Sequence, residues 1–392
     1  MFAAQNPEPI AVFKPKFRTQ EILDELKICF EKGWTGLGFK TVEFEKQWSN
    51  YSSLPNSHFI SSNTVGLHLA LKIFKDSEGW KDGDEIITTP LTFVSTNHSI
   101  LYENLSPVFA DIDEYLCLDP DSVESKITPK TKAVMFVGIG GNTGQLDVIS
   151  EICKRYNLRL ILDAAHMAGT YVKRGDEIRH VGSEADVSIF SFQAVKNLPT
   201  ADSGMICFKD KKYSEIARKL SWLGIDIDTY KRTDPKGTYK WRYDVPHVGF
   251  KYHGNSIMAA IGLVQLKYLN EDNKYRNYIS NFYDSKFEDN EKFSIIGSAP
   301  YCHINSRHLY QIKLNENYNR DIFVDYLSTR NIFPGVHYID NTNYFPYKEY
   351  SGLCPNASLA SESIITLPIH LNLEDNHLEH IVHSVNEALD KI

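Results

Sequence analysis

The chain has 392 residues, of which 42% are apolar and 23% charged, and this composition excludes an intrinsically disordered, collagen-like or coiled-coil protein. Its 42 basic and 50 acidic side chains give a net charge of −8 without a long basic run, so we do not expect binding to nucleic acid. The length suits one large α/β unit or two to three domains.

The N-terminal segment, residues 1–17, has neither a basic start nor an apolar block, so we expect an ordered arm rather than a signal peptide. No uncharged stretch reaches the roughly 20 apolar residues that a membrane span needs. The six cysteines lie far apart without a C-x-x-C pair, which disfavours a disulfide framework and a zinc ribbon. We therefore expect a soluble protein of the reducing cytoplasm.

Short apolar runs alternate with helix-like segments between residues 58 and 210, and this is the pattern of βαβ units. Because the runs are apolar on both faces, they predict a mostly parallel sheet between layers of helices. Asp147 is predicted to cap one crossover helix, which would end at Asn157. The predicted strands are 58–61, 85–89, 107–111, 133–139, 159–163, 186–190 and 204–208.

The alternation stops at residues 230–246, which are rich in lysine and arginine and are predicted to form an exposed loop. A long helix is predicted over about 256–268, followed by strongly polar helical segments and then by a strand and two helices. These later elements, at 309–314, 320–330 and 376–392, indicate a smaller C-terminal α/β domain. We assign the N-terminal arm and large domain to residues 1–250 and the small domain to residues 251–392.

Three places in the predicted sheet carry residues that suit catalysis. The first is the step from strand to helix at Ser62 and Thr64, where free backbone N–H groups, the helix dipole and two hydroxyls would bind a phosphate. On its own, such a segment is more often a simple helix cap.

The second place has Asp163 and His166 just beyond a buried strand, at the edge where parallel sheets bind ligands. The alternative roles are capping of the next helix for Asp163 and a hydrogen bond to the backbone for His166. The third place is Lys196, whose small and apolar neighbours would lower its pKa and make it nucleophilic toward carbonyls. The alternative for Lys196 is a side chain that extends to solvent.

Together these three places match the needs of pyridoxal phosphate (PLP). The phosphate of PLP needs a helix N-terminus, its pyridine nitrogen needs a carboxylate, and its aldehyde needs a lysine for a Schiff base.

A histidine motif at 377, 380 and 383 could suggest a metal site, but these positions drift around a helix and no metal is expected.

The chain resembles the DegT/StrS family of PLP-dependent nucleotide-sugar aminotransferases, which have the fold-type I, aspartate aminotransferase-like architecture. The resemblance runs nearly from end to end, although Asn63 stands where the family often has glycine. It rests on the motifs at 33–38, 61–71, 89–96, 163–166, 191–197, 249–266 and 336–338.

The resemblance implies that Lys196 forms the Schiff base, that Asp163 pairs with the pyridine nitrogen and that His166 bonds to the ring hydroxyl. It also implies which residues surround the cofactor and the sugar. Thr64, Ser191 and the backbone N–H of Val65 would hold the phosphate, Phe93 would stack on the ring, and Trp34, His337 and Tyr338 would line the sugar pocket.

The segment 250–255 resembles the stretch by which one family member reaches into the cofactor site of its partner, which implies a homodimer with shared active sites. Either Lys251 or His253 would contact the partner's phosphate. The basic loop 230–246 would supply counter-charge for a substrate pyrophosphate or, as is commoner, would only be solvated.

The resemblance implies transfer of an amino group, from L-glutamate, to a nucleotide-linked keto-6-deoxy sugar. The product would serve a surface glycan, such as lipopolysaccharide O-antigen, or a secondary metabolite. The alternatives are a sugar dehydratase of the same family, against which Lys196 argues because dehydratases replace it by histidine, and a non-catalytic PLP-binding regulator.

Overall fold

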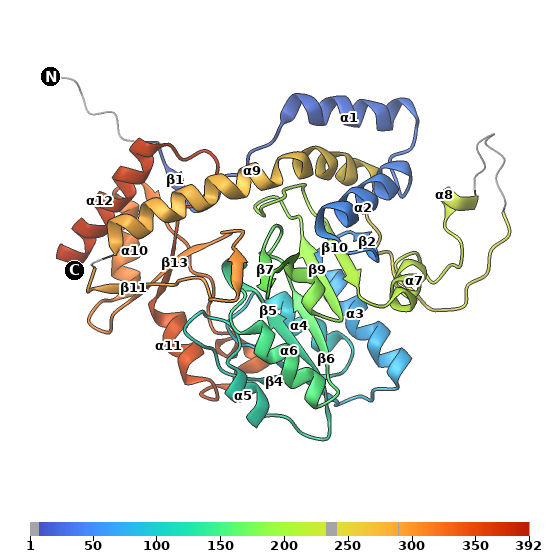
Figure 1. The fold of residues 1–392 in the computed structure, drawn as a ribbon, viewed down its shortest axis with the longest axis horizontal. Helices are drawn as coiled ribbons and strands as arrows, with labels where there is room; N and C mark the ends of the chain where they lie inside the picture. Colours follow the sequence, from blue (N-terminus) through green and yellow to red (C-terminus); the bar gives the residue numbers. More distant parts are fainter. Residues whose placement is uncertain (1–7, 233–240, 289, 392) are drawn as a thin grey trace.

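The computed structural model describes residues 8–232, 241–288 and 290–391 (Figure 1). Its centre is a seven-stranded sheet in which one strand, β10, is antiparallel to both neighbours while the other pairings are parallel. This confirms the predicted mostly parallel sheet. The spatial order is β2 (Ser57–Ile60), β10 (Gly204–Phe208), β9 (Val187–Ser191), β6 (Arg159–Asp163), β5 (Thr131–Val137), β3 (Glu85–Thr88) and β4 (Ser106–Phe109).

Helices cover both faces of this sheet because successive strand residues point to opposite sides. Along β6, Leu162 belongs to the core on one face and Ile161 to the core on the other. The first face packs against α2 (Phe39–Ser52), α5 (Pro120–Ser125), α6 (Leu146–Arg155) and part of α9 (Ser256–Phe287). The second packs against α3 (Asn63–Glu78), α4 (Val94–Tyr102) and α7 (Lys211–Leu220).

The contact between α3 and the sheet depends on Gly66. A Cβ atom at this position would lie 2.5 Å from Ile60 and 2.6 Å from Ile189, closer than carbon atoms can approach. Glycine therefore lets the N-terminus of α3 lie directly against the sheet, at the edge where the site forms.

The helix α9 runs across the upper part of the molecule in Figure 1 and joins two hydrophobic cores. Leu263 and Leu269 in its first half pack into the core of the large sheet, whereas Ile279 and Tyr283 pack into a second core. That second core contains a three-stranded sheet and the helices α10 (Arg320–Thr329) and α12 (Asp375–Lys391). The strands are β11 (Phe293–Ile295), β13 (Tyr310–Leu314) and β15 (Ile364–Leu367).

Smaller elements complete the described chain. The N-terminal arm contributes β1 (Ile10–Ala11), which pairs in parallel with β14 (Ile332–Phe333). A third sheet combines β12 (Cys302–Ile304), β7 (Tyr171–Arg174) and β8 (Glu177–His180), and the remaining helices are α1 (Thr19–Glu31), α8 (Thr229–Arg232) and α11 (Pro355–Ser363). Within the described ranges, no helix has the length and apolar character that a membrane crossing requires.

Two local predictions were wrong. Asp147 does not cap α6, because the helix begins at Leu146 with Gln145 before it, and Asp147 lies inside the first turn. The helix predicted over 256–268 continues to Phe287, since its second half has a separate core to pack against.

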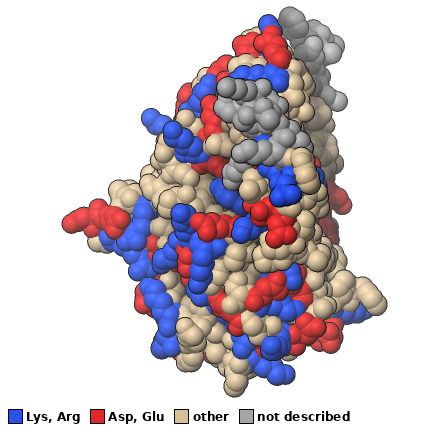
Figure 2. Space-filling model, turned by 90° about the vertical axis from the view of Figure 1, so that its right-hand side faces the viewer, with Lys and Arg blue, Asp and Glu red and all other residues tan. Residues whose placement is uncertain are grey.

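The predicted exposed loop, 230–246, begins within α8, which stands away from the body of the molecule (Figure 1). Residues 233–240, with Lys236 and Lys240, lie outside the described residues. Arg242 is exposed, whereas Arg232 is buried with its guanidinium 4.5 Å from the centre of the Tyr243 ring. Figure 2 shows basic and acidic side chains interspersed over this face of the molecule.

Candidate active site

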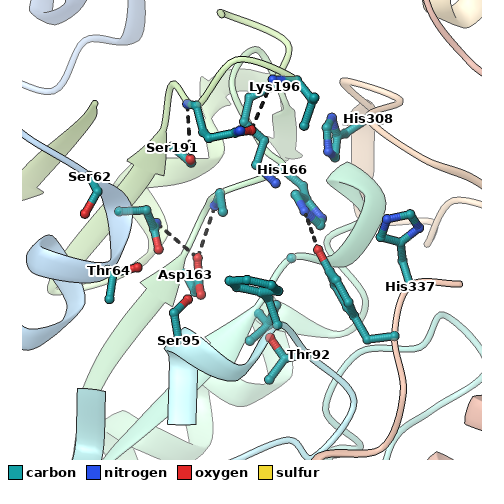
Figure 3. Close-up of a pocket in the computed structure, with 18 of the residues that line it drawn as sticks. Ser62, Thr64, Thr92, Ser95, Asp163, His166, Ser191, Lys196, His308 and His337 are labelled. Atoms are coloured by element: carbon teal, nitrogen blue, oxygen red, sulfur yellow. Dashed lines mark hydrogen bonds between the residues drawn. The ribbon is translucent and has the colours of Figure 1, made fainter. Parts of the chain in front are cut away.

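A cavity of about 420 Å³ opens at the carboxyl ends of β5, β6 and β9 (Figure 3). The strand register brings these ends together, because Asp163 is paired with Val137 on one side and Ile189 on the other. The N-terminal arm and the segments around residues 308 and 337 close the cavity. Of the residues predicted from the sequence, the lining contains Ser62, Thr64, Phe93, Asp163, His166, Ser191, Lys196, His337 and Tyr338.

The Asp163 carboxylate is buried and accepts three hydrogen bonds. Its Oδ1 accepts from Asn63 Nδ2 and from the Ala165 N–H, both at 3.2 Å, and its Oδ2 accepts from Thr96 Oγ1 at 2.8 Å. Thr96 has only one hydroxyl proton, so Thr92 donates to Thr96 across the 2.9 Å between their oxygens. Burial raises the pKa of Asp163, while the three donors and Lys196 act in the opposite direction.

Lys196 enters the cavity from the loop after β9, where its backbone N–H donates to Gln193 O at 2.8 Å. Burial lowers the pKa of its amine to about 8, although the negative charge of Asp163 favours the ammonium form. At pH 7 about one Lys196 side chain in ten is therefore an uncharged amine, the form that acts as a nucleophile.

His166 is held as a neutral imidazole of one tautomer. The backbone N–H of Gly140 donates to its Nδ1 at 3.1 Å, so the proton is on Nε2, which donates to Tyr338 Oη at 3.1 Å. Burial lowers the pKa of His166 well below its usual value, and the charge of Lys196 lowers it further. The Tyr338 hydroxyl therefore accepts a hydrogen bond from His166 and can donate its own proton to a further group.

The N-terminus of α3, where an anion cradle was predicted, lies at the cavity. Ser62 is the N-cap, and its Oγ accepts the N–H of Val65 at 3.3 Å, so this N–H already has a partner and Val65 does not line the cavity. Thr64 and Ser191 do line it. The side chain of Asn63 turns away from the cradle to donate to Asp163 and to Ile189 O.

Three other predicted residues lie outside this cavity. Trp34 donates through Nε1 to Leu37 O at 2.8 Å and packs against the Tyr230 ring. Lys251 forms an isolated antiparallel bridge with Trp222, and His253 forms one with Ile60. The Lys251 Nζ lies 3.4 Å, and the centre of the His253 ring 4.4 Å, from the centre of the Trp222 ring.

The histidines at 377, 380 and 383 do not converge. His377 Nδ1 accepts from the Glu374 N–H, and His380 Nε2 donates to Arg330 O at 2.9 Å. His383 lies 4.0 Å from Glu387. Within the described residues, no cluster of three or more potential metal ligands is found.

Sequence reasoning missed the residues that orient the carboxylate and close the cavity. Thr96 and Asn63 bond directly to Asp163, and Phe13 and His308 line the cavity from distant parts of the chain. The signal for Asn63 was present as its departure from the family pattern. For the others, only the tertiary fold identifies the contact.

A profile of the DegT/DnrJ/EryC1/StrS aminotransferase family matches residues 17–386. The spore coat polysaccharide biosynthesis protein SpsC of Bacillus subtilis strain 168 is 33% identical, over 94% of this chain and 95% of that protein.

Two solved structures are similar over nearly the whole of both chains. The aminotransferase TlmJ from Streptoalloteichus hindustanus has a TM-score of 0.88 at 30% identity, covering 97% of this chain and 99% of that chain. The putative sugar aminotransferase Spr1654 from Streptococcus pneumoniae, in its PLP form, has a TM-score of 0.86 at 27% identity, with the same coverage. These similarities confirm the expected fold-type I α/β architecture.

Proposed function

The chain belongs to the DegT/DnrJ/EryC1/StrS aminotransferase family, and from this premise we propose that it is a PLP-dependent transaminase acting on a nucleotide-linked keto-6-deoxy sugar, with L-glutamate as amino donor. The observation that carries the proposal is one cavity lined by a half-buried lysine of lowered pKa, a buried carboxylate and the N-terminus of a helix.

The residues present fit PLP on chemical grounds. The Asp163 carboxylate is fixed by Thr96 and Asn63 and can offer a negative charge to a protonated pyridine nitrogen. Ser62, Thr64 and Ser191 supply hydroxyls beside the α3 N-terminus, where a phosphate is favoured. The bound cofactor would supply an electron sink for loss of the donor's Cα proton.

The protein's own groups would then divide the work. The Lys196 amine would hold the cofactor through its aldehyde and, when free, would take and return the proton at the donor's Cα. Tyr338 would donate its free proton to the ring hydroxyl, and His166 would orient Tyr338 through its Nε2–H. Phe93 is 59% exposed at the cavity, so its face is available for stacking on a ring.

A sugar substrate is supported by the relatives and by the outer part of the cavity. SpsC is named for polysaccharide biosynthesis and Spr1654 as a putative sugar aminotransferase. His337 and Tyr338 line the cavity and can hydrogen-bond to sugar hydroxyls, while Trp34 stays a prediction for this pocket. We propose that the product is an amino sugar for a surface glycan, such as lipopolysaccharide O-antigen, or for a secondary metabolite.

A homodimer with shared sites is the assembly we propose. Lys251 and His253 lie outside their own cavity, where they would be available to a partner's phosphate. The described residues beside this segment include exposed apolar side chains, among them Trp241 at 71% and Val248 at 92%, which a partner would cover. All six cysteines are free thiols, which supports a reducing cytoplasm as the compartment.

Mixed dimers test the shared site. In a dimer of a Lys196→Ala subunit and a subunit with Lys251→Ala and His253→Ala, one cavity carries both defects and the other carries neither. The mixed dimer, with one intact cavity of two, is expected to have about half of the wild-type activity. No recovery, with dimers present by light scattering, would favour cavities that each subunit completes alone.

The proposed reaction is tested by absorbance and by mass spectrometry. Wild-type protein with PLP is expected to gain a visible absorbance band and a borohydride-reducible link at residue 196, and Lys196→Ala to lose both. A panel of keto-sugar nucleotides with glutamate is then analysed by product mass. A nitrogen-containing sugar supports the transaminase, loss of water without nitrogen supports the dehydratase, and an unchanged panel despite bound PLP supports the non-catalytic regulator.

A further inference from the structure

The segment 250–254, which carries the residues proposed to reach a partner's phosphate, is fixed by backbone hydrogen bonds on two sides. On one side the N–H of Ser61, directly after β2, donates to Tyr252 O at 2.8 Å. On the other side Ser221 O, directly after α7, accepts the N–H groups of Tyr252 and His253 at 3.0 and 3.2 Å. The segment therefore lies between the end of β2 and the end of α7.

Neighbouring side chains of this segment point to opposite sides, as they do in a strand. Lys251 and His253 share one side, where both lie against the Trp222 ring. Tyr252 lies on the other side, where its ring stacks on that of Phe250 with 4.7 Å between the centres and 6° between the planes. A contact that holds Tyr252 therefore also sets the direction in which Lys251 and His253 project.

Such a contact is made by a buried histidine of α3. His68 Nδ1 lies 3.0 Å from Tyr252 Oη, and His68 Nε2 lies 2.7 Å from Oε1 of Glu103, the residue that follows α4. A carboxylate can only accept, so Nε2 carries the proton, and Nδ1 of the neutral ring accepts the Tyr252 hydroxyl proton. Burial raises the pKa of Tyr252, so the phenol keeps this proton. His68 and Glu103 are only 7% and 9% exposed, so water competes little for these bonds.

We propose that His68 is a positioning residue for the cavity of the partner subunit. It holds Tyr252, and Tyr252 in turn fixes the face of the segment 250–254 that would reach the partner's phosphate site. Glu103 keeps the His68 ring in the orientation and tautomer that this contact needs. The inference rests on the proposed homodimer with shared sites. Neither His68 nor Tyr252 belongs to the lining that the described residues form around their own cavity.

The alternative role for this contact is support of the subunit's own cavity. Tyr252 O accepts the N–H of Ser61, and the next residue, Ser62, is the N-cap of α3 and lines that cavity. Loss of the contact with His68 would then weaken the cavity of the same subunit. The two roles thus differ in which of the two cavities of a dimer is affected.

Two substitutions break the contact in different ways. Tyr252→Phe removes the hydroxyl and keeps the stacked ring, whereas His68→Gln can still reach Glu103 but has no acceptor at the Nδ1 position. In homodimers we expect each to weaken PLP binding about three- to tenfold, as for loss of one hydrogen bond. Because both remove the same bond, the double variant should bind PLP no more weakly than either single variant.

The matched control is Tyr275→Phe. It also removes one tyrosine hydroxyl bond, to Leu373 O at 2.6 Å, but beside the second core and far along the chain from the segment 250–254. This variant is expected to bind PLP like wild type.

Mixed dimers with Lys196→Ala show which cavity the contact serves. Two different affinity tags isolate dimers of one Tyr252→Phe subunit and one Lys196→Ala subunit. Only the Tyr252→Phe subunit has the lysine that gives the visible PLP band, and its cavity receives the unaltered segment of the Lys196→Ala subunit. We therefore expect this band to titrate with the PLP affinity of wild type, although the Tyr252→Phe homodimer binds PLP more weakly.

A mixed dimer that binds PLP as weakly as the Tyr252→Phe homodimer would assign the contact to its own cavity and overturn the proposal. Wild-type PLP affinity in the Tyr252→Phe and His68→Gln homodimers would overturn it as well. If Tyr252→Phe does not fold, His68→Gln takes its place in the mixed dimer.

Failure of the proposed function gives different results. Homodimers with both Lys251→Ala and His253→Ala that bind PLP like wild type would refute the shared phosphate site, and the role of His68 with it. Normal binding of PLP without amination of any keto sugar would refute the transaminase alone, because the titrations of the visible band need no turnover.

Discussion

Replacement of Lys196 by methionine is expected to abolish the link to PLP and yet to stabilise the apoprotein. The amine is buried, and its pKa falls from 10.5 to about 8, which corresponds to about 3 kcal/mol of unfavourable folding free energy at neutral pH. Methionine keeps the apolar stem and removes the charge. Because Asp163 loses an attractive partner, the net gain is expected to be about 1–3 kcal/mol at pH 7.

The sign of the pH dependence follows from the lowered pKa. The unfolded chain holds the Lys196 proton up to pH 10.5 and the folded chain only up to about 8, so the full cost is present below pH 8 and disappears as the pH rises toward 10.5. The advantage of Lys196→Met over wild type should therefore shrink at pH 9.5 to roughly half or less of its value at pH 7.

Urea unfolding of the two apoproteins at pH 7 and pH 9.5 measures this difference. Lys211→Met serves as a control, because the Lys211 side chain is 79% exposed and no comparable gain is expected from removing its charge. A Lys196→Met protein no more stable than wild type at pH 7, or an advantage unchanged at pH 9.5, would refute the reasoning.

Two further substitutions probe the scaffold of the site. Thr96→Val removes the 2.8 Å hydrogen bond to Asp163 Oδ2, which favours the charged carboxylate. PLP should therefore dissociate about tenfold more readily from this variant in a spectroscopic titration, whereas Thr96→Ser should bind PLP normally. Equal PLP affinity in wild type and both variants would contradict this role of Thr96. Gly66→Ala would place a Cβ 2.6 Å from Ile189 and should lower the free energy of unfolding by about 1–3 kcal/mol. The control is Gly297→Ala, whose added Cβ meets no atom within 4 Å and should leave the stability nearly unchanged. Similar stabilities of the two variants would show that α3 can move away from the sheet.

Elements with local signals were predicted well. The strands at 159–163 and 204–208 have the predicted bounds, because a buried strand is an apolar run with polar or glycine ends. The helix α9 was predicted too short, since its second half is polar on most sides and is stabilised by a core that only the folded small domain provides. The start of α6 was misplaced because a nearby Asp suggested a cap that the backbone does not use.

The candidate site likewise combines residues that local sequence patterns predict with residues that only the fold brings together. Lys196 and Asp163 could be found because each follows a recognisable strand, whereas the residues that orient them could not. Asn63 reaches Asp163 across 100 residues, Thr96 across 67, and His308 reaches Asn197 across 111. No short-range pattern reports such a contact, since hydroxyls and amides are common everywhere and acquire a role only through the groups that the fold brings beside them.

These long-range bonds also explain why the site sits where the two cores meet. Asn273 lies on α9 between the residues that pack into the large-sheet core and those that pack into the second core. Through Asn197 it fixes both the loop of Lys196 and, at His308, the chain that leads into β13. Any shift between the cores would break the buried hydrogen bonds of these amide side chains, at a cost of about 1–3 kcal/mol for each group left unsatisfied. The packing that stabilises the fold therefore also holds the Lys196 loop and the chain at His308 in register.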